Sequence, residues 1–234
     1  AFSNCSYLKE VNMRGSVEHI RDYAFNACSE MQSIDLTGVK SIAPYALSST
    51  ALTEISMPDV EILQKYAFYE CDSLKTVALS NKLNIIPEGC FYKCTALTTV
   101  TGGENVTEIG NSAFGNCGLT SFDFNDKVTT LVRYAFSNCA ELQSISGTSA
   151  IATLEYGAFY NCKALAGELE FPAITSIEQY TFYYCNALKG VTFGDGLTSL
   201  PTYTFYNCVE LEYVSLPAGL TQVANFPFSG VNKL

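Results

Sequence analysis

Several residue types that serve chemistry in proteins are scarce in this sequence. Its 234 residues include no tryptophan and one histidine, and 13 Lys and Arg stand against 23 Asp and Glu, for a formal charge of −10. Basic clusters neutralise phosphates, so their scarcity argues against nucleic acid as a partner. A single imidazole, His19, leaves no Ser-His-Asp triad and no histidine-rich metal centre to assemble. We therefore expect no metal, no cofactor and no catalytic site of these kinds.

Long apolar runs are missing as well. No segment approaches the roughly 18 to 20 consecutive apolar residues that cross a bilayer. The first ten residues, AFSNCSYLKE, have neither the basic start nor the apolar stretch of a signal peptide. The chain is nevertheless 48% hydrophobic and 15% charged, which is too apolar for a disordered protein. The composition predicts a folded protein without a transmembrane segment.

What the sequence does contain is a repeat of 21 to 23 residues. A phenylalanine, once replaced by leucine, recurs at this period, and we call these positions the phenylalanine column: Phe2, Phe25, Leu47, Phe68, Phe91, Phe114, Phe136, Phe159, Phe182, Phe205 and Phe228. An aliphatic residue stands five positions before each member from the second onward, and a Leu or Met follows five or six positions after it. A short segment of the pattern L-x-x-[VI]-x-[LF] comes next, and its alternation is typical of a β-strand.

A unit of this size cannot bury its own apolar residues, so the copies must stack on one another. We predict a β-rich solenoid, a leucine-rich repeat arc of about ten coils of 21–23 residues, with one short parallel strand in each. Residues 1–234 form a single solenoid domain in this interpretation. The chain starts and stops within a repeat and neither end shows a polar cap, so we expect a fragment of a longer chain.

Cysteine follows the same period. Nine of the ten cysteines stand three positions after the phenylalanine column: Cys5, Cys28, Cys71, Cys94, Cys117, Cys139, Cys162, Cys185 and Cys208. The slot accepts small side chains, and a thiol there would be a buried small hydrophobe whose S–H bonds a carbonyl. A disulfide framework would show unequal, loop-closing spacings, and zinc would need C-x-x-C pairs or histidines. We predict a structural ladder of buried, free thiols, with oxidised pairs between neighbouring coils as the alternative.

At these residues a family resemblance emerges. The unit I-x-x-x-A-F-x-x-C-x-x-L-x-x-[VI]-x-[LF]-P, present from Ile177 and again from Leu200 to Pro217, resembles the BspA-like leucine-rich repeat of bacterial surface proteins. It spans essentially the whole chain, with departures such as Leu47 and Thr50 in place of Phe and Cys. The resemblance implies a cell-surface or secreted adhesion module that binds a protein or glycan on another cell or on matrix, without catalysis. It names no ligand.

The residue between the last two apolar positions of each strand should face outwards on the concave side. The predicted concave face comprises Asp35, Ser56, Thr101, Asp123, Ser146, Glu170, Thr192 and Ser215. This set of side chains offers few groups that act in catalysis. Asp35 and Glu54, on neighbouring predicted strands, form the one carboxylate pair of the kind that a glycosidase uses. Solvated carboxylates are ordinary on an acidic surface, which favours a non-catalytic role.

The tyrosines form two further columns, two positions before and one position after the phenylalanine column. In the last three full repeats they converge, and these residues are the candidate ligand-binding set: Tyr160, Tyr180, Tyr183, Tyr203 and Tyr206. Aromatic side chains with a polar tip are enriched at recognition surfaces. The alternative is that the rings stack between coils and simply cover the flank of the solenoid.

Three hypotheses for function follow. The sequence favours a non-catalytic binding module, because the features that could contact a partner are an extended face, the aromatic columns and the acidic charge. A structural stalk that carries another domain is the first alternative, and it predicts that the fragment binds nothing. A carbohydrate-active enzyme is the second, and it requires a carboxylate pair in a cleft.

Overall fold

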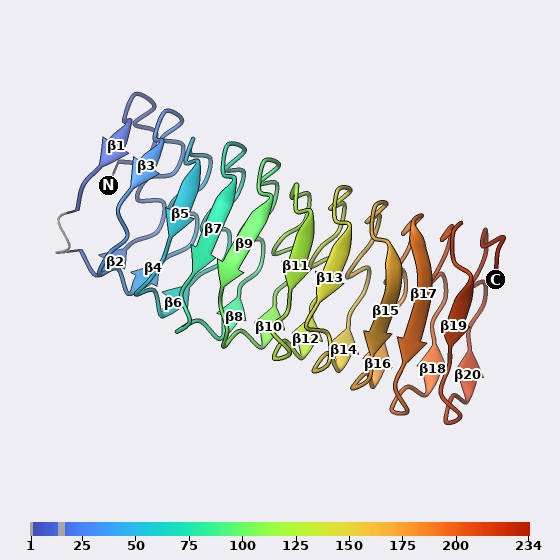
Figure 1. The fold of residues 1–234 in the computed structure, drawn as a ribbon. Coiled ribbons are helices and arrows are strands. Elements are labelled where there is room, and N and C mark those ends of the chain that lie inside the picture. The colour runs from blue at the N-terminus through green and yellow to red at the C-terminus, as the bar shows by residue number, and fades with distance from the viewer. Residues whose placement is uncertain (1, 14–16) are drawn as a thin grey trace.

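The computed structural model describes residues 2–13 and 17–234. The chain winds into a single row of stacked coils, with its two termini at opposite ends of the row (Figure 1). Each coil carries a strand on each of two different sides, and from β5 onward the strand on one side is the longer; no residue of the described ranges lies in a helix. Strands pair only with their counterparts in neighbouring coils, and every pair is parallel. The predicted β-solenoid is therefore confirmed.

The longer strands follow the predicted L-x-x-[VI]-x-[LF] segments. They are β1 (Glu10–Val11), β3 (Ser33–Ile34), β5 (Glu54–Ser56), β7 (Thr76–Leu79), β9 (Thr99–Gly102), β11 (Ser121–Asp123), β13 (Ser144–Ser146), β15 (Gly167–Phe171), β17 (Leu188–Phe193) and β19 (Tyr213–Ser215). The shorter strands each have two residues. They are β2 (His19–Ile20), β4 (Ser41–Ile42), β6 (Ile62–Leu63), β8 (Ile85–Ile86), β10 (Glu108–Ile109), β12 (Thr130–Leu131), β14 (Thr153–Leu154), β16 (Ser176–Ile177), β18 (Ser199–Leu200) and β20 (Gln222–Val223).

The shorter strands are the main departure from the prediction of one strand per coil. Each contains the aliphatic residue five positions before the phenylalanine column, and the residue before it points outwards, as with exposed Ile85 and buried Ile86. The backbone groups on this side meet the same segment of the next coil, and pairing satisfies them. The ladder is regular through the middle of the chain, where β8, β10, β12, β14 and β16 form one five-stranded sheet.

The turn around each phenylalanine adds a third ladder of backbone hydrogen bonds. In one coil the amides of Tyr134, Phe136 and Asn138 donate to carbonyls of the next coil at 2.9, 2.9 and 2.7 Å. Tyr134 and Asn138, which flank the phenylalanine at two positions on either side, have φ of 56° and 57°. These two residues, with their left-handed backbone, turn alternate amides towards the next coil. In the coils that follow, the residues two positions before and after the phenylalanine column also have positive φ.

The phenylalanine column is the centre of the core. Successive rings from Phe68 to Phe205 stack with centroids 5.3 to 5.7 Å apart, and all of them are fully buried. Phe122 and Phe124 add edge contacts to Phe136, with centroids 4.9 and 5.6 Å away. The continuous stack explains why a 23-residue unit tolerates so little change at this position.

The structure contains a column of buried cysteines, with one departure from the predicted ladder. All ten cysteines are free, and nine are buried. Each buried ladder thiol donates to the carbonyl of the phenylalanine column one coil earlier, as Cys162 does to Phe136 at 3.1 Å and Cys208 to Phe182 at 3.0 Å. Burial raises the pKa of the Cys139 and Cys208 thiols to about 12. The prediction of burial is wrong for Cys5, which is exposed because no described coil precedes it to cover it.

Candidate binding surfaces

The outward side chains of the longer strands form a continuous surface, which we call the long-strand face. From β3 to β19 it consists of Ser33, Asp35, Glu54, Ser56, Thr76, Ala78, Thr99, Thr101, Ser121, Asp123, Ser144, Ser146, Glu168, Glu170, Gly190, Thr192, Tyr213 and Ser215. All the residues predicted for the concave face lie on it. They are exposed except Thr192, which is half-buried beside Tyr213.

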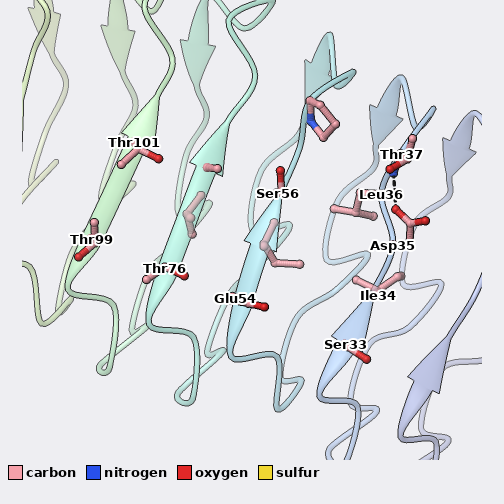
Figure 2. Close-up of a pocket in the computed structure, with 14 residues that line it drawn as sticks. Ser33, Ile34, Asp35, Leu36, Thr37, Glu54, Ser56, Thr76, Thr99 and Thr101 are labelled. Atoms are coloured by element: carbon pink, nitrogen blue, oxygen red, sulfur yellow. Dashed lines mark hydrogen bonds between the residues drawn. The ribbon is translucent and has the colours of Figure 1, made fainter.

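Strand register lines these residues up in rows across the coils. Glu54, Thr76 and Thr99 are partners in one row, and Ser56 and Thr101 belong to the next row (Figure 2). Hydroxyl groups predominate, so a ligand lying across the coils would meet a repeated set of short hydrogen-bonding side chains. The inward neighbours Ile55 and Val77 are buried, so the outward residues are free of the core.

The charge of the long-strand face is mainly negative. Asp35, Glu54, Asp123, Glu168 and Glu170 are its carboxylates between β3 and β19, and the one basic residue on a strand of this span is the exposed Lys189, at the bulge of β17. None of the five pairs with a Lys or Arg among the described residues, whose ion pairs lie elsewhere, as at Lys93 and Glu70. A predominantly acidic field of this kind favours basic partners.

A groove of about 560 Å³ runs across the first coils of this face. Its lining extends from Ser33 and Asp35 at β3 to Thr99 and Thr101 at β9 (Figure 2). Polar and apolar atoms both line it, because Ile34, Pro58 and Ala78 contribute alongside the hydroxyl groups. The groove is broad enough for an extended chain or a sugar, in the volume range of ligand sites.

The carboxylate pair foreseen as a possible glycosidase site lies in this groove, but Asp35 is engaged. Its Oδ1 accepts a hydrogen bond from the backbone N–H of Thr37 at 2.9 Å. That hydrogen bond holds the pKa of Asp35 below its usual value. A general acid needs a raised pKa, so the shift is in the wrong direction for that role.

The tyrosine columns form a flank of stacked rings. The five candidate residues of the last repeats are in mutual contact: Tyr160 stacks on Tyr183 and Tyr183 on Tyr206 at 4.9 and 4.7 Å, while Tyr180 and Tyr203 pack at 5.3 to 5.5 Å against that stack. All five are half-buried. Stacking is thus observed, and a binding role for these rings stays a prediction.

A second group of tyrosines was not singled out from the sequence. Tyr45, Tyr66, Tyr69 and Tyr92, which we call the tyrosine corner, line a hollow of about 380 Å³ together with Ser112. A signal for it does exist in the sequence. The next members of the two columns are Gly89, Ser112, Gly115 and Ser137, so both tyrosine columns are interrupted after Tyr66 and Tyr92.

Within residues 2–13 and 17–234, no group of three or more His, Cys, Asp and Glu is placed to hold a metal ion. The same residues include no helix long and apolar enough to cross a membrane.

Comparison with known proteins identifies the repeats. A model of the BspA-type leucine-rich repeat region, in six copies, matches residues 1–73, 61–173 and 167–234. The chain belongs to this family. No curated protein matches the BspA-type chain closely enough to suggest a more specific role.

Solved structures support the same fold. A leucine-rich cell surface protein from Faecalibacterium prausnitzii is 27% identical, with a TM-score of 0.65, over 100% of this chain and 73% of that one. A leucine-rich repeat protein from Bacteroides ovatus is 22% identical, with a TM-score of 0.64 and the same coverage. The leucine-rich repeat protein of T. pallidum is 20% identical with a TM-score of 0.52, over 74% of this BspA-type chain and 73% of its own. At these identities the last two show the fold alone.

Proposed function

We propose that this BspA-type chain is a non-catalytic binding module of a cell-surface or secreted protein, which adheres to a protein or glycan on another cell or on matrix. The long-strand face carries the proposal. Its exposed side chains have no part in the core, and they present hydroxyl groups and unpaired carboxylates along the whole stack.

The location rests on similarity. The F. prausnitzii protein with the same fold is a cell surface protein, and its sequence is 27% identical. Repeat stacks of this kind present extended surfaces that suit large partners. A surface location would place the long-strand face and the tyrosine flank in reach of other cells.

Two alternatives make different predictions. A stalk would use the same coils only as a spacer and would bind nothing. A carbohydrate-active enzyme would need an acid and a base in the groove, and the lowered pKa of Asp35 removes this residue as the acid.

The test is direct binding of the chain to a panel of immobilised extracellular-matrix proteins and glycans. An unrelated acidic solenoid serves as the control, because it reproduces the net charge without these side chains. Saturable binding to a panel member by this chain alone is the expected result. If the chain binds no panel member, the proposal is contradicted and the stalk is the better account. If the chain turns over a glycan, the enzyme hypothesis is supported.

A further inference from the structure

The tyrosine corner joins two stacks of rings. Tyr45 and Tyr66 stack at 4.9 Å with their planes 14° apart, and Tyr69 and Tyr92 stack at 6.0 Å with planes 13° apart. Tyr23 stacks on the other face of Tyr45 at 5.1 Å. Tyr69 stands edge-on to Tyr45 and Tyr66, at 68° and 81°. Two pairs of rings therefore meet at a steep angle, and the hollow of about 380 Å³ lies where all four line it.

The corner is held in place by its surroundings. The Tyr66 hydroxyl donates to Oε1 of Glu88 at 2.8 Å. Its ring lies over Gly89, where an added Cβ would come within 2.1 Å of ring carbon Cε1. Tyr45 and Tyr66 both have left-handed backbones, with φ of 55° and 59°, a conformation that disfavours a side chain. Rings fixed in this way lose little freedom when a ligand enters.

The protein already places one cation against these rings. Nζ of Lys93 lies 5.9 Å from the ring centroid of Tyr69 and 5.8 Å from that of Tyr92. Glu70 fixes the ammonium group at 2.8 Å. Aromatic faces attract cations, so this internal contact shows which chemistry the ring pair accepts.

The charge around the corner favours a further cation. Lys93 and Glu70 neutralise each other, while the Glu88 carboxylate at the corner pairs with no Lys or Arg of the described chain. Burial and the hydrogen bond to Glu88 raise the pKa of Tyr66 to about 12, so the ring stays uncharged at physiological pH. The chain as a whole carries −10.

We propose that the tyrosine corner binds a cationic side chain, lysine or arginine, presented by a protein partner. The inference rests on the proposed binding role and names the partner chemistry for one surface. A neutral sugar could also stack on such rings, but it would gain nothing from Glu88 or from the net charge. That ligand is therefore an outcome of the test.

Calorimetric titration of the chain with three probes separates these cases. The first is an extended Gly/Ser peptide with lysine and arginine at intervals, the second is the same peptide with acetyl-lysine and citrulline, and the third is a neutral oligosaccharide. We expect the first to bind, and the second to bind at least about tenfold more weakly because the cation–π attraction is gone. Equal binding of the charged and neutral peptides, preference for the sugar, or no binding of the charged peptide would overturn the proposal.

Matched variants locate the site. The double variant Tyr69→Leu, Tyr92→Leu removes the ring pair that contacts Lys93 and should weaken binding about tenfold, whereas Tyr69→Phe, Tyr92→Phe keeps the rings and should stay within about twofold. Lys93→Gln removes a competing positive charge and should strengthen binding several-fold. Unchanged affinity in the Leu pair, or weaker binding in Lys93→Gln, contradicts a cation site. Urea unfolding of each variant shows that the fold is retained.

The two proposals fail in different ways. If a panel protein binds but the charged peptide does not, the cation site at the tyrosine corner is refuted and the adhesion role is retained. If the charged peptide binds at the corner while the matrix and glycan panel is silent, the adhesion role falls and the cation site stands.

Discussion

Truncation of Phe136 to alanine tests the stacked core most severely. The side chain is fully buried, and its ring contacts Phe114, Phe122, Phe124 and Phe159 with centroids 4.9 to 5.7 Å away. Removing a buried phenylalanine costs about 3 to 5 kcal/mol. Aromatic pairs add about 0.5 to 1.5 kcal/mol each beyond area, so we expect the upper end of that range.

Ile62→Ala is the matched control. Ile62 is also large and apolar, but it is 56% exposed on the outer side of β6, and its truncation should cost no more than about 0.5 kcal/mol. Urea unfolding should be followed by far-UV circular dichroism and by tyrosine fluorescence, because repeat stacks can unfold in parts. If Phe136→Ala unfolds at the same urea concentration as Ile62→Ala, the stacked column is not the core.

Three further predictions concern other parts of the stack. In native protein a thiol reagent should label Cys5 alone, and all ten cysteines should react in denaturant; rapid native labelling of several would refute the buried ladder. The raised pKa of Tyr66 stabilises the fold below about pH 10, and this contribution should fade as the pH rises to about 12. Tyr66→Phe should flatten that part of the stability curve, and an unchanged slope would count against it. Gly190→Ala should destabilise the chain, because the added Cβ would come within 2.4 Å of the Tyr213 ring. The truncating variant Tyr213→Ala should relieve this loss of stability in a double-mutant cycle.

Much of the fold could be predicted because the same pattern of apolar residues recurs in every repeat. The phenylalanine column, the strand pattern and the thiol slot recur in register, and stacking is the one arrangement that buries them all. The shorter strands escaped prediction because two residues, one inward and one outward, are too few to show an alternation. The exposure of Cys5 depends on the neighbouring coil, which its own repeat does not contain.

The candidate surfaces were predicted less evenly. The outward residues of the longer strands follow from the period of two, and the structure places all of them on one face. The tyrosine corner depends on how rings tilt, and Tyr66 tilts over Gly89 of the following coil. Its left-handed backbone could not be foreseen either, because this conformation is typical of Gly and Asn rather than Tyr.

The account's central claim is that inward columns make the fold while the long-strand face makes the binding surface. The triple variant Ser56→Lys, Thr101→Lys, Ser146→Lys tests it on exposed positions, with Thr153→Lys, Ser176→Lys, Ser199→Lys as the control on the shorter strands. The measurement is the affinity of both triples for the matrix or glycan partner that the panel identifies, beside their urea unfolding. We predict that both fold, that the first loses at least about tenfold in affinity because it adds three positive charges to the acidic face, and that the second binds normally. Equal affinity of the two triples would contradict the claim.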